Sequence, residues 1–209
     1  MLPLFPLQLV VYPREELNLH IFEPRYRQLI SECEEEGITF GIPAFMDDAV
    51  AEIGTEMELL RVAKRYPDGK MDVVTQGVGL FRIGRFFREA PGKLYAGAEV
   101  EPLPFRLDDG DPVVAQQLLD MVGELYQLLG VDREAPDDPS GFFTYQVAHH
   151  VGFSLKQQYE LLTRTGEGER QQYMLQHLEE FLPRVRHMNE VRQRIQMNGH
   201  FRNIQPPKL

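Results

Sequence analysis

Side chains that could act as nucleophiles are few in this chain, and none has the surroundings that catalysis requires. Serine occurs only at Ser31, Ser140 and Ser154. Ser31 lies within an expected helix and lacks the glycine-flanked turn that presents a serine nucleophile, while the other two are typical of a turn and a helix cap. The single cysteine, Cys33, excludes an internal disulfide and falls on the apolar stripe of the same helix, which favours a packed side chain over a reactive thiolate. We therefore expect no catalytic residue.

Spacings that would hold a metal ion or a phosphate are also missing. No H-E-x-x-H motif occurs, and the adjacent His149 and His150 would point about 100° apart on a helix, which favours structural or solvent-facing roles. The glycines at 77, 79 and 84 match neither the P-loop nor the dinucleotide-binding pattern. The sequence predicts a protein that is not an enzyme and has no metal site and no cofactor.

Four side chains remain as binding candidates: Arg25, Arg27, Phe86 and Phe87. The two arginines lie in the first turn of an expected helix, where each opposes the macrodipole by roughly 0.3–1 kcal/mol. Either they pair with carboxylates elsewhere in the domain or they face a ligand. The two phenylalanines are consecutive on an expected strand, so at least one should point away from the core. That side chain either contacts a ligand or packs beneath the helices that follow.

The arginines follow a strand that leads directly into a helix. Leu17, Leu19 and Ile21 alternate with polar or exposed positions, which is typical of a strand with one buried face. Proline suits the first position of a helix, so Glu23-Pro24 predicts an N-cap followed by the first turn. The stripe expected to be buried consists of Tyr26, Leu29, Ile30 and Cys33, and Gly37 is the expected left-handed end.

The segment from Ile38 to Leu103 has the pattern of a curled sheet. Short apolar runs are separated by glycines, which suggests bulges or corners. Pro67-Asp68-Gly69 is the clearest turn and should join 56–66 to 70–77 as a hairpin. This favours a small twisted β-barrel over a flat sheet.

Beyond Pro104 the period becomes helical. Helices are expected over 111–129, 142–150, 154–164 and 167–197, the third beginning with a capping box at Ser154 and Gln157. The last helix carries an apolar seam and would span roughly 45 Å, longer than a small bundle covers, so its far end could join a second copy of the chain. The expected fold class is α+β, with a barrel subdomain at 1–107 and a helical bundle subdomain at 108–209.

Charge and hydropathy limit the partners. The chain has 209 residues, 43% of them hydrophobic, and a net charge of −10, which disfavours nucleic acid and anionic lipid as partners. No apolar run approaches the ~20 residues that span a membrane, and the apolar start has no basic leader, so a cytoplasmic protein is expected. The segment 184–208 is locally basic, which indicates a solvated helix face or, alternatively, a site for an anionic partner.

The stretch Leu19-His20-Ile21-Phe22-Glu23-Pro24-Arg25-Tyr26-Arg27 closely resembles the opening of the N-terminal, substrate-binding domain of bacterial-type Lon proteases. The likeness continues through Phe40-Gly41-Ile42, Ile53-Gly54-Thr55, Pro67-Asp68-Gly69-Lys70, Gly77–Ile83 and Asp138–Phe142. The resemblance implies a PUA-like β-barrel followed by a helical bundle. It also implies that the family-motif residues are architectural: His20, Glu23, Pro24, Tyr26, Gly54, Gly69 and Gly77.

In full-length Lon this region helps to recognise substrates and supports assembly, whereas ATP hydrolysis and peptide cleavage belong to later domains. Neither a Walker motif nor a Ser-Lys protease core occurs here, so the resemblance implies a stand-alone, non-catalytic recognition module for unfolded or apolar polypeptide segments or for a protein partner. RNA binding is the alternative, because PUA-like barrels often bind RNA, although the overall acidity argues against it. A small-molecule hydrolase is a weak third hypothesis, since no constellation of residues supports it.

Overall fold

The computed structural model describes residues 1–200 except 140 and 142, and it describes side chains as far as residue 195. Ser140, Phe142 and the basic residues Arg202 and Lys208 therefore lie outside the described residues. The chain forms two compact units. The first, which we call the sheet unit, comprises 1–108 and 153–167, and the second, the helical unit, comprises 109–152 and the chain from 168 onward.

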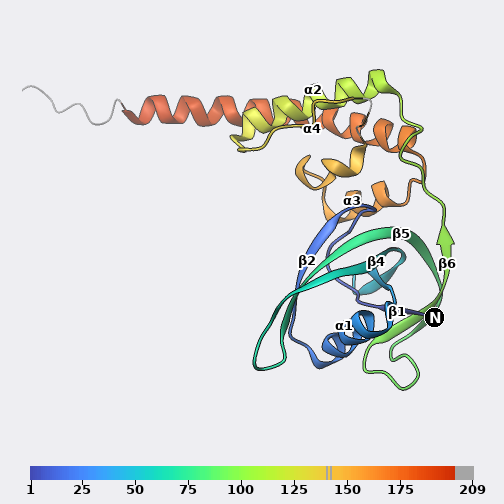
Figure 1. The fold of residues 1–209 in the computed structure, drawn as a ribbon. Helices are drawn as coiled ribbons and strands as arrows, with labels where there is room; N and C mark the ends of the chain where they lie inside the picture. Colours follow the sequence, from blue (N-terminus) through green and yellow to red (C-terminus); the bar gives the residue numbers. More distant parts are fainter. Residues whose placement is uncertain (140, 142, 201–209) are drawn as a thin grey trace, which may run out of the picture. The chain divides into compact units, whose positions relative to one another are not determined.

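The sheet unit is built on six strands. They are β1 (Leu2–Leu4), β2 (Glu16–Ile21), β3 (Phe40–Met46), β4 (Ala49–Arg65), β5 (Met71–Phe87) and β6 (Ala96–Leu103). Their order is β2-β5-β4-β3-β1-β6, and a further pairing of β5 with β6 brings the sheet back on itself. Only β1 and β3 pair in parallel. Figure 1 shows β4 and β5 as long strands that curl around the unit.

The expected α+β fold with a twisted, curled sheet is confirmed, although the sheet is not a regular barrel. The strand β5 serves two sets of partners, because its first part pairs with β2 and its last part pairs with β6. Register shifts interrupt β3–β4, β4–β5 and β5–β6, and such bulges increase local bending and twist. The result is a mixed sheet that closes unevenly.

Helix α1 (Pro24–Glu36) packs against this sheet (Figure 1) and supplies much of its core. It begins at Pro24 and ends at Gly37, whose φ of 67° is left-handed, as the sequence predicts. The predicted stripe is buried, and Tyr26 stacks on Phe5 with ring centroids 3.6 Å apart. Glu23 occupies the N-cap position, but its side chain does not cap the helix and pairs instead with Arg25 at 2.7 Å.

The predicted hairpin at Pro67-Asp68-Gly69 is present between β4 and β5. Gly69 has a φ of 81°, which favours glycine, and its N–H donates to the carbonyl of Tyr66 at 2.9 Å. Gly77 has a different requirement, since a Cβ there would lie 2.4 Å from the carbonyl oxygen of Tyr12. These two glycines are needed for a turn and for a close backbone approach, respectively.

Helix α3 (Leu155–Leu162) belongs to the sheet unit, although sequence analysis places it in the helical half. Its capping box forms as predicted between Ser154 and Gln157. Two hydrogen bonds hold the helix to the rest of the unit: the N–H of Ile53 in β4 donates to the Tyr159 hydroxyl at 3.1 Å, and the hydroxyl of Tyr12, in the β1–β2 connection, donates to the carbonyl of Gln158 at 3.2 Å. These contacts explain why 153–167 groups with the sheet.

The helical unit contains α2 (Pro112–Leu129) and the long α4 (Glu167–His200). The Asp111 side chain caps α2, which ends at the left-handed Gly130, and Glu124 of α2 pairs with Arg186 of α4 at 2.5 Å. The prediction of an α-helix over 142–150 is wrong. The structure has two single 3₁₀ turns, η1 (Thr144–Gln146) and η2 (Ala148–His150), because the local bonds reach only three residues, as from Gln146 to Phe143.

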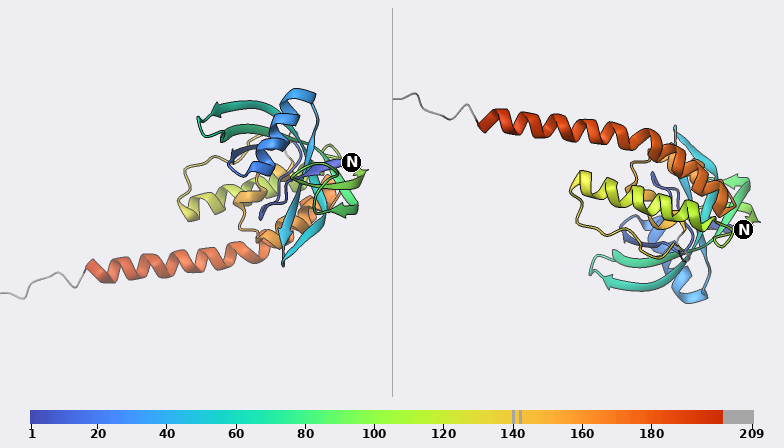
Figure 2. Two further views of the ribbon diagram at one scale, coloured as in Figure 1. Left: turned by 90° about the horizontal axis from the view of Figure 1, so that it is seen from below. Right: turned by 90° about the horizontal axis from the view of Figure 1, so that it is seen from above.

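The apolar seam of α4 is buried over only part of its length. Of its predicted members, Met174, Leu178 and Val185 are buried and Phe181 is half-buried, whereas Met188, Val191 and Ile195 are exposed. Figures 1 and 2 show the helix continuing beyond α2 toward its C-terminal end. The predicted length is confirmed, while pairing of the exposed half with a second copy stays a prediction.

Candidate functional site

A groove opens on the sheet unit where β4 and β5 separate, and we call it the β4–β5 groove. Its volume is about 610 Å³, within the ~300–1,000 Å³ typical of ligand sites. It is lined by Phe45, Asp48, Val50, Ala51, Glu52, Ile83, Phe86 and Arg88. The strand β3, the hairpin into β4, and the end of β5 therefore each contribute to it.

Strand pairing explains why the groove exists. The last pair between β4 and β5 is Ile53 with Arg82. Beyond this pair, β4 continues toward its hairpin with β3, where Val50 pairs with Phe45, while β5 continues along β6, where Phe86 pairs with Ala98. Each strand keeps a partner on its outer side, and the space between them is left open.

Phe86 supplies the largest apolar side chain on the β5 side of the groove. It is 39% exposed, which is unusual for an aromatic side chain on a paired strand. Phe87 is half-buried and lies under the Arg85 guanidinium, 4.9 Å from its ring centroid. Only Phe86 of the two predicted phenylalanines therefore lines the groove.

Each end of the groove carries one acidic and one basic side chain. At the narrow end, Arg82 pairs with Glu52 at 2.8 Å across the diverging strands. Toward the wide end, Asp48 contributes a carboxylate from the β3–β4 turn and Arg88 a guanidinium from just beyond β5. Neither Asp48 nor Arg88 forms an ion pair within the part of the chain that the structure describes.

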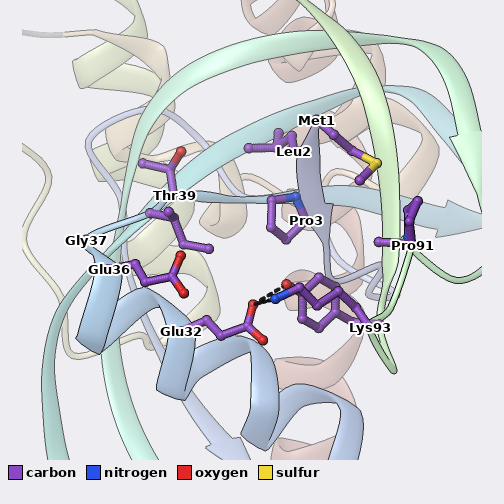
Figure 3. Close-up of a pocket in the computed structure, with 12 residues that line it drawn as sticks. Met1, Leu2, Pro3, Glu32, Glu36, Gly37, Thr39, Pro91 and Lys93 are labelled. Carbon is purple, nitrogen blue, oxygen red and sulfur yellow. Dashed lines mark hydrogen bonds and ion pairs between the residues drawn. The ribbon is translucent and has the colours of Figure 1, made fainter.

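A second hollow of about 490 Å³, the α1 hollow, lies between the end of α1, the strand β1 and the β5–β6 connection. Figure 3 shows Lys93 reaching Glu32 across it, and this distance is 2.8 Å. The Tyr95 hydroxyl also donates to Glu32, and the Gln28 amide donates to its other oxygen at 2.9 Å. The carboxylate of Glu32 is thus saturated by its neighbours.

These contacts set the pKa values in the α1 hollow. Burial raises the pKa of Glu32, but hydrogen bonds from Lys93, Tyr95 and Gln28 outweigh burial and lower it overall. Burial, together with the Glu32 carboxylate, raises the pKa of Tyr95. Burial, reinforced by the Glu32 charge, also raises the pKa of the Cys33 thiol to about 12, so this thiol is almost entirely protonated at neutral pH.

The two candidate arginines lie on α1 and do not line the β4–β5 groove. Arg25 pairs with Glu23 and lies 4.6 Å from the Tyr26 ring centroid, while Arg27 donates to the carbonyl of Asp68 at 2.9 Å. Asp68 lies in the turn before β5, whereas Phe86 lies near its end. The structure does not bring the arginines and the phenylalanines into one site.

The motif residue His20 forms a contact between strands. Its Nδ1–H donates to Asp72 at 2.6 Å, and Tyr66 donates to the other oxygen of this carboxylate at 2.7 Å. The same two hydrogen bonds lower the pKa of Asp72. Since His20 and Asp72 are register partners on β2 and β5, this contact helps to hold the edge strand β2.

The described residues form neither a metal-binding cluster nor a membrane-spanning helix. Among the described residues, no group of three or more His, Cys, Asp or Glu side chains is arranged to hold a metal ion. No helix within the same residues has the length and apolar character needed to cross a bilayer.

Solved structures with this fold define the class of protein. The Lon N-terminal domain protein from Xanthomonas campestris is 25% identical, with a TM-score of 0.62 over 83% of this chain and 96% of that one. The N-terminal domain of the Mycobacterium avium complex Lon protease is 17% identical, with a TM-score of 0.59 over 86% of this chain and 98% of that one. The chain has the fold of a Lon N-terminal domain.

The family follows from the sequence. The model of the ATP-dependent protease La (LON) substrate-binding domain matches residues 1–180, and the chain belongs to this family. The Lon protease of Flavobacterium johnsoniae is 24% identical over 94% of this chain. The match covers 26% of that protein, so the chain spans about a quarter of the length of this relative.

Proposed function

We propose that this protein is a non-catalytic module that binds unfolded or apolar polypeptide segments in the β4–β5 groove. The observation that carries the proposal is the exposed Phe86 ring in an apolar groove with Phe45, Val50 and Ile83. An exposed aromatic side chain in a concave apolar surface gains free energy when a ligand removes it from water. The family name, which specifies substrate binding, supports the same function.

Competing functions have less support. Catalysis would need an activated nucleophile, and the raised pKa of Cys33 and the saturated carboxylate of Glu32 offer none in the α1 hollow. RNA binding would need a basic surface, whereas the groove carries Asp48 and Glu52 beside Arg88 and the chain has a net charge of −10. Polypeptide recognition is therefore the function that we advance.

The test is a titration of the full chain into a fluorescein-labelled unfolded protein, reduced and carboxymethylated lactalbumin, followed by anisotropy. Phe86→Ser is expected to weaken binding by tenfold or more, because truncation of a central aromatic contact commonly has such an effect. Phe22→Ser is the matched control: Phe22 is 58% exposed but lies outside the groove, so affinity should stay within twofold.

Two results would reject this proposal. One is equal loss of affinity in both variants, which would separate binding from the groove. The other is an absence of binding by the parent chain. The same titration with a labelled single-stranded RNA at low salt tests the alternative, and we expect no change in anisotropy.

A further inference from the structure

The sides of the β4–β5 groove are strand edges without partners. Beyond the pair Ile53–Arg82, Val50 of β4 pairs with Phe45 of β3 while Ala51 and Glu52 fall in a register shift of that pairing, and Ile83–Phe87 of β5 pairs only toward β6. In an antiparallel strand, alternate residues direct their N–H and C=O groups to opposite edges. Some backbone groups of both segments therefore face the groove.

No described backbone contact fills this opening. Among the described residues, no backbone-to-backbone hydrogen bond outside the regular elements involves Val50–Glu52 or Ile83–Phe87. Gly84, Arg85 and Phe86 are exposed. Unpaired strand edges readily accept another chain by β-pairing. The groove therefore offers backbone donors and acceptors in addition to an apolar surface.

A bulge at Gly84 places two apolar side chains of β5 on the same wall. Ile83 and Phe86 are three residues apart, and in a regular strand they would point to opposite faces. The register with β6 shifts between Ile83 and Arg85, which inserts one residue and returns Phe86 to the side of Ile83. Both residues line the groove. The wall is thus suited to a partner strand with apolar side chains at alternate positions.

The charges near the wide end of the groove favour particular side chains in a bound segment. Arg88 immediately follows β5 and has no ion-pair partner among the described residues, so an acidic side chain at the adjoining end of a bound segment would complement it. At the narrow end, the Glu52–Arg82 pair closes the space between the strands. Within the described part of the chain, the wide end therefore carries the unpaired charges of Arg88 and Asp48, whereas the charges at the narrow end are paired with each other.

We infer that the β4–β5 groove binds its polypeptide as an added β-strand, antiparallel to β5 along Ile83–Phe87, with apolar side chains at alternate positions and an acidic residue next to Arg88. This inference deepens the proposed function and rests on it. Main-chain hydrogen bonds would supply affinity with little dependence on the ligand's sequence. The alternate apolar side chains and the acidic end would supply the preference for particular sequences.

The test uses a labelled peptide of alternating valine and threonine with glutamate at its N-terminal end, titrated against the full chain. Two analogues carry esters in place of amides, one at the valines and one at the threonines, so each loses one alternate set of N–H donors with little change in shape. At least one analogue should bind tenfold or more weakly than the parent peptide. Affinities of both analogues within twofold of the parent would overturn strand addition.

Two further measurements bear on the same inference. On addition of the parent peptide, amide hydrogen exchange should slow within Ile83–Phe87, and unchanged exchange there would contradict pairing with β5. A peptide with lysine in place of the glutamate should bind about fivefold more weakly to the parent chain and regain affinity for Arg88→Glu. Failure of this rescue would reject the assigned acidic end.

The outcomes separate this inference from the proposed function. If the unfolded lactalbumin binds and Phe86→Ser weakens it, but the alternating peptide fails to bind or both esters bind normally, the recognition function stands and strand addition is wrong. If the unfolded lactalbumin does not bind, the proposed function fails and the inference fails with it.

Discussion

The α1 hollow and the β4–β5 groove have similar volumes, about 490 and 610 Å³, but their polar groups are satisfied in opposite ways. In the α1 hollow, Glu32 accepts hydrogen bonds from Lys93, Tyr95 and Gln28. In the groove, two strand edges lack partners and Phe86 is exposed. Polar groups that already have hydrogen-bond partners stabilise the fold, whereas unpaired strand edges and an exposed aromatic ring are available to a ligand.

The largest expected effect is on stability in the α1 hollow. Tyr95 is 2% exposed, so Tyr95→Ala should lower the free energy of unfolding by about 3–5 kcal/mol through a lost ring and a cavity. Phe86→Ala removes a ring from an exposed position and should lower it by less than about 1 kcal/mol. Urea denaturation of the full chain measures both. Equal losses would remove the distinction between the two hollows.

An intermediate effect is expected for Glu32→Gln. Loss of the charge-assisted hydrogen bonds from Lys93 and Tyr95 should lower the free energy of unfolding by about 1–3 kcal/mol at neutral pH. The folded-state pKa of Glu32 lies below its ordinary value of 4.5, so its contribution is present above that value and is lost as pH falls through the lowered pKa.

The parent chain and Glu32→Gln should therefore converge in stability as the pH is lowered from 7 to 3. Denaturation curves at several pH values check this. A difference that stays constant over the whole range would show that the charge of Glu32 does not carry the effect. Binding of unfolded lactalbumin at neutral pH should be the same for both chains, because Glu32 does not line the groove.

The sequence predicted features that depend on local chemistry. The start of α1 at Pro24, its end at Gly37, the hairpin at Pro67-Asp68-Gly69 and the capping box at Ser154 all follow from dihedral or hydrogen-bonding preferences of nearby residues. The prediction of a helix over 142–150 was wrong for a related reason. An apolar pattern in a short segment does not ensure the four-residue bonds of an α-helix, and here three-residue bonds form instead.

The groove could be predicted only in part. Consecutive phenylalanines indicated one exposed ring, but Phe45 and Val50 join Phe86 only because β4 and β5 stop pairing with each other beyond Ile53 and Arg82. This separation depends on pairing between distant segments, which periodicity does not encode. The one local signal was the spacing of Ile83 and Phe86 around Gly84, which is consistent with a bulge. Whether ligands use this site stays a prediction.

The smallest effect on stability is expected in α4. The apolar side chains of this helix are buried in its first part and exposed in its later part. Met188 is 70% exposed, so Met188→Ala should change the free energy of unfolding by less than about 0.5 kcal/mol. The exposed Met188, Val191 and Ile195 nevertheless continue an apolar seam, and such a seam gains free energy by pairing with another helix.

We therefore expect the full chain to self-associate as its concentration rises, and the double change Met188→Glu with Ile195→Glu to abolish this. Sedimentation velocity over a range of protein concentrations measures the effect, with Val113→Glu as a control, because Val113 is 75% exposed but lies on α2. A parent chain that stays monomeric throughout would contradict pairing through the exposed part of α4, because the exposed seam would then be too short to hold a second copy.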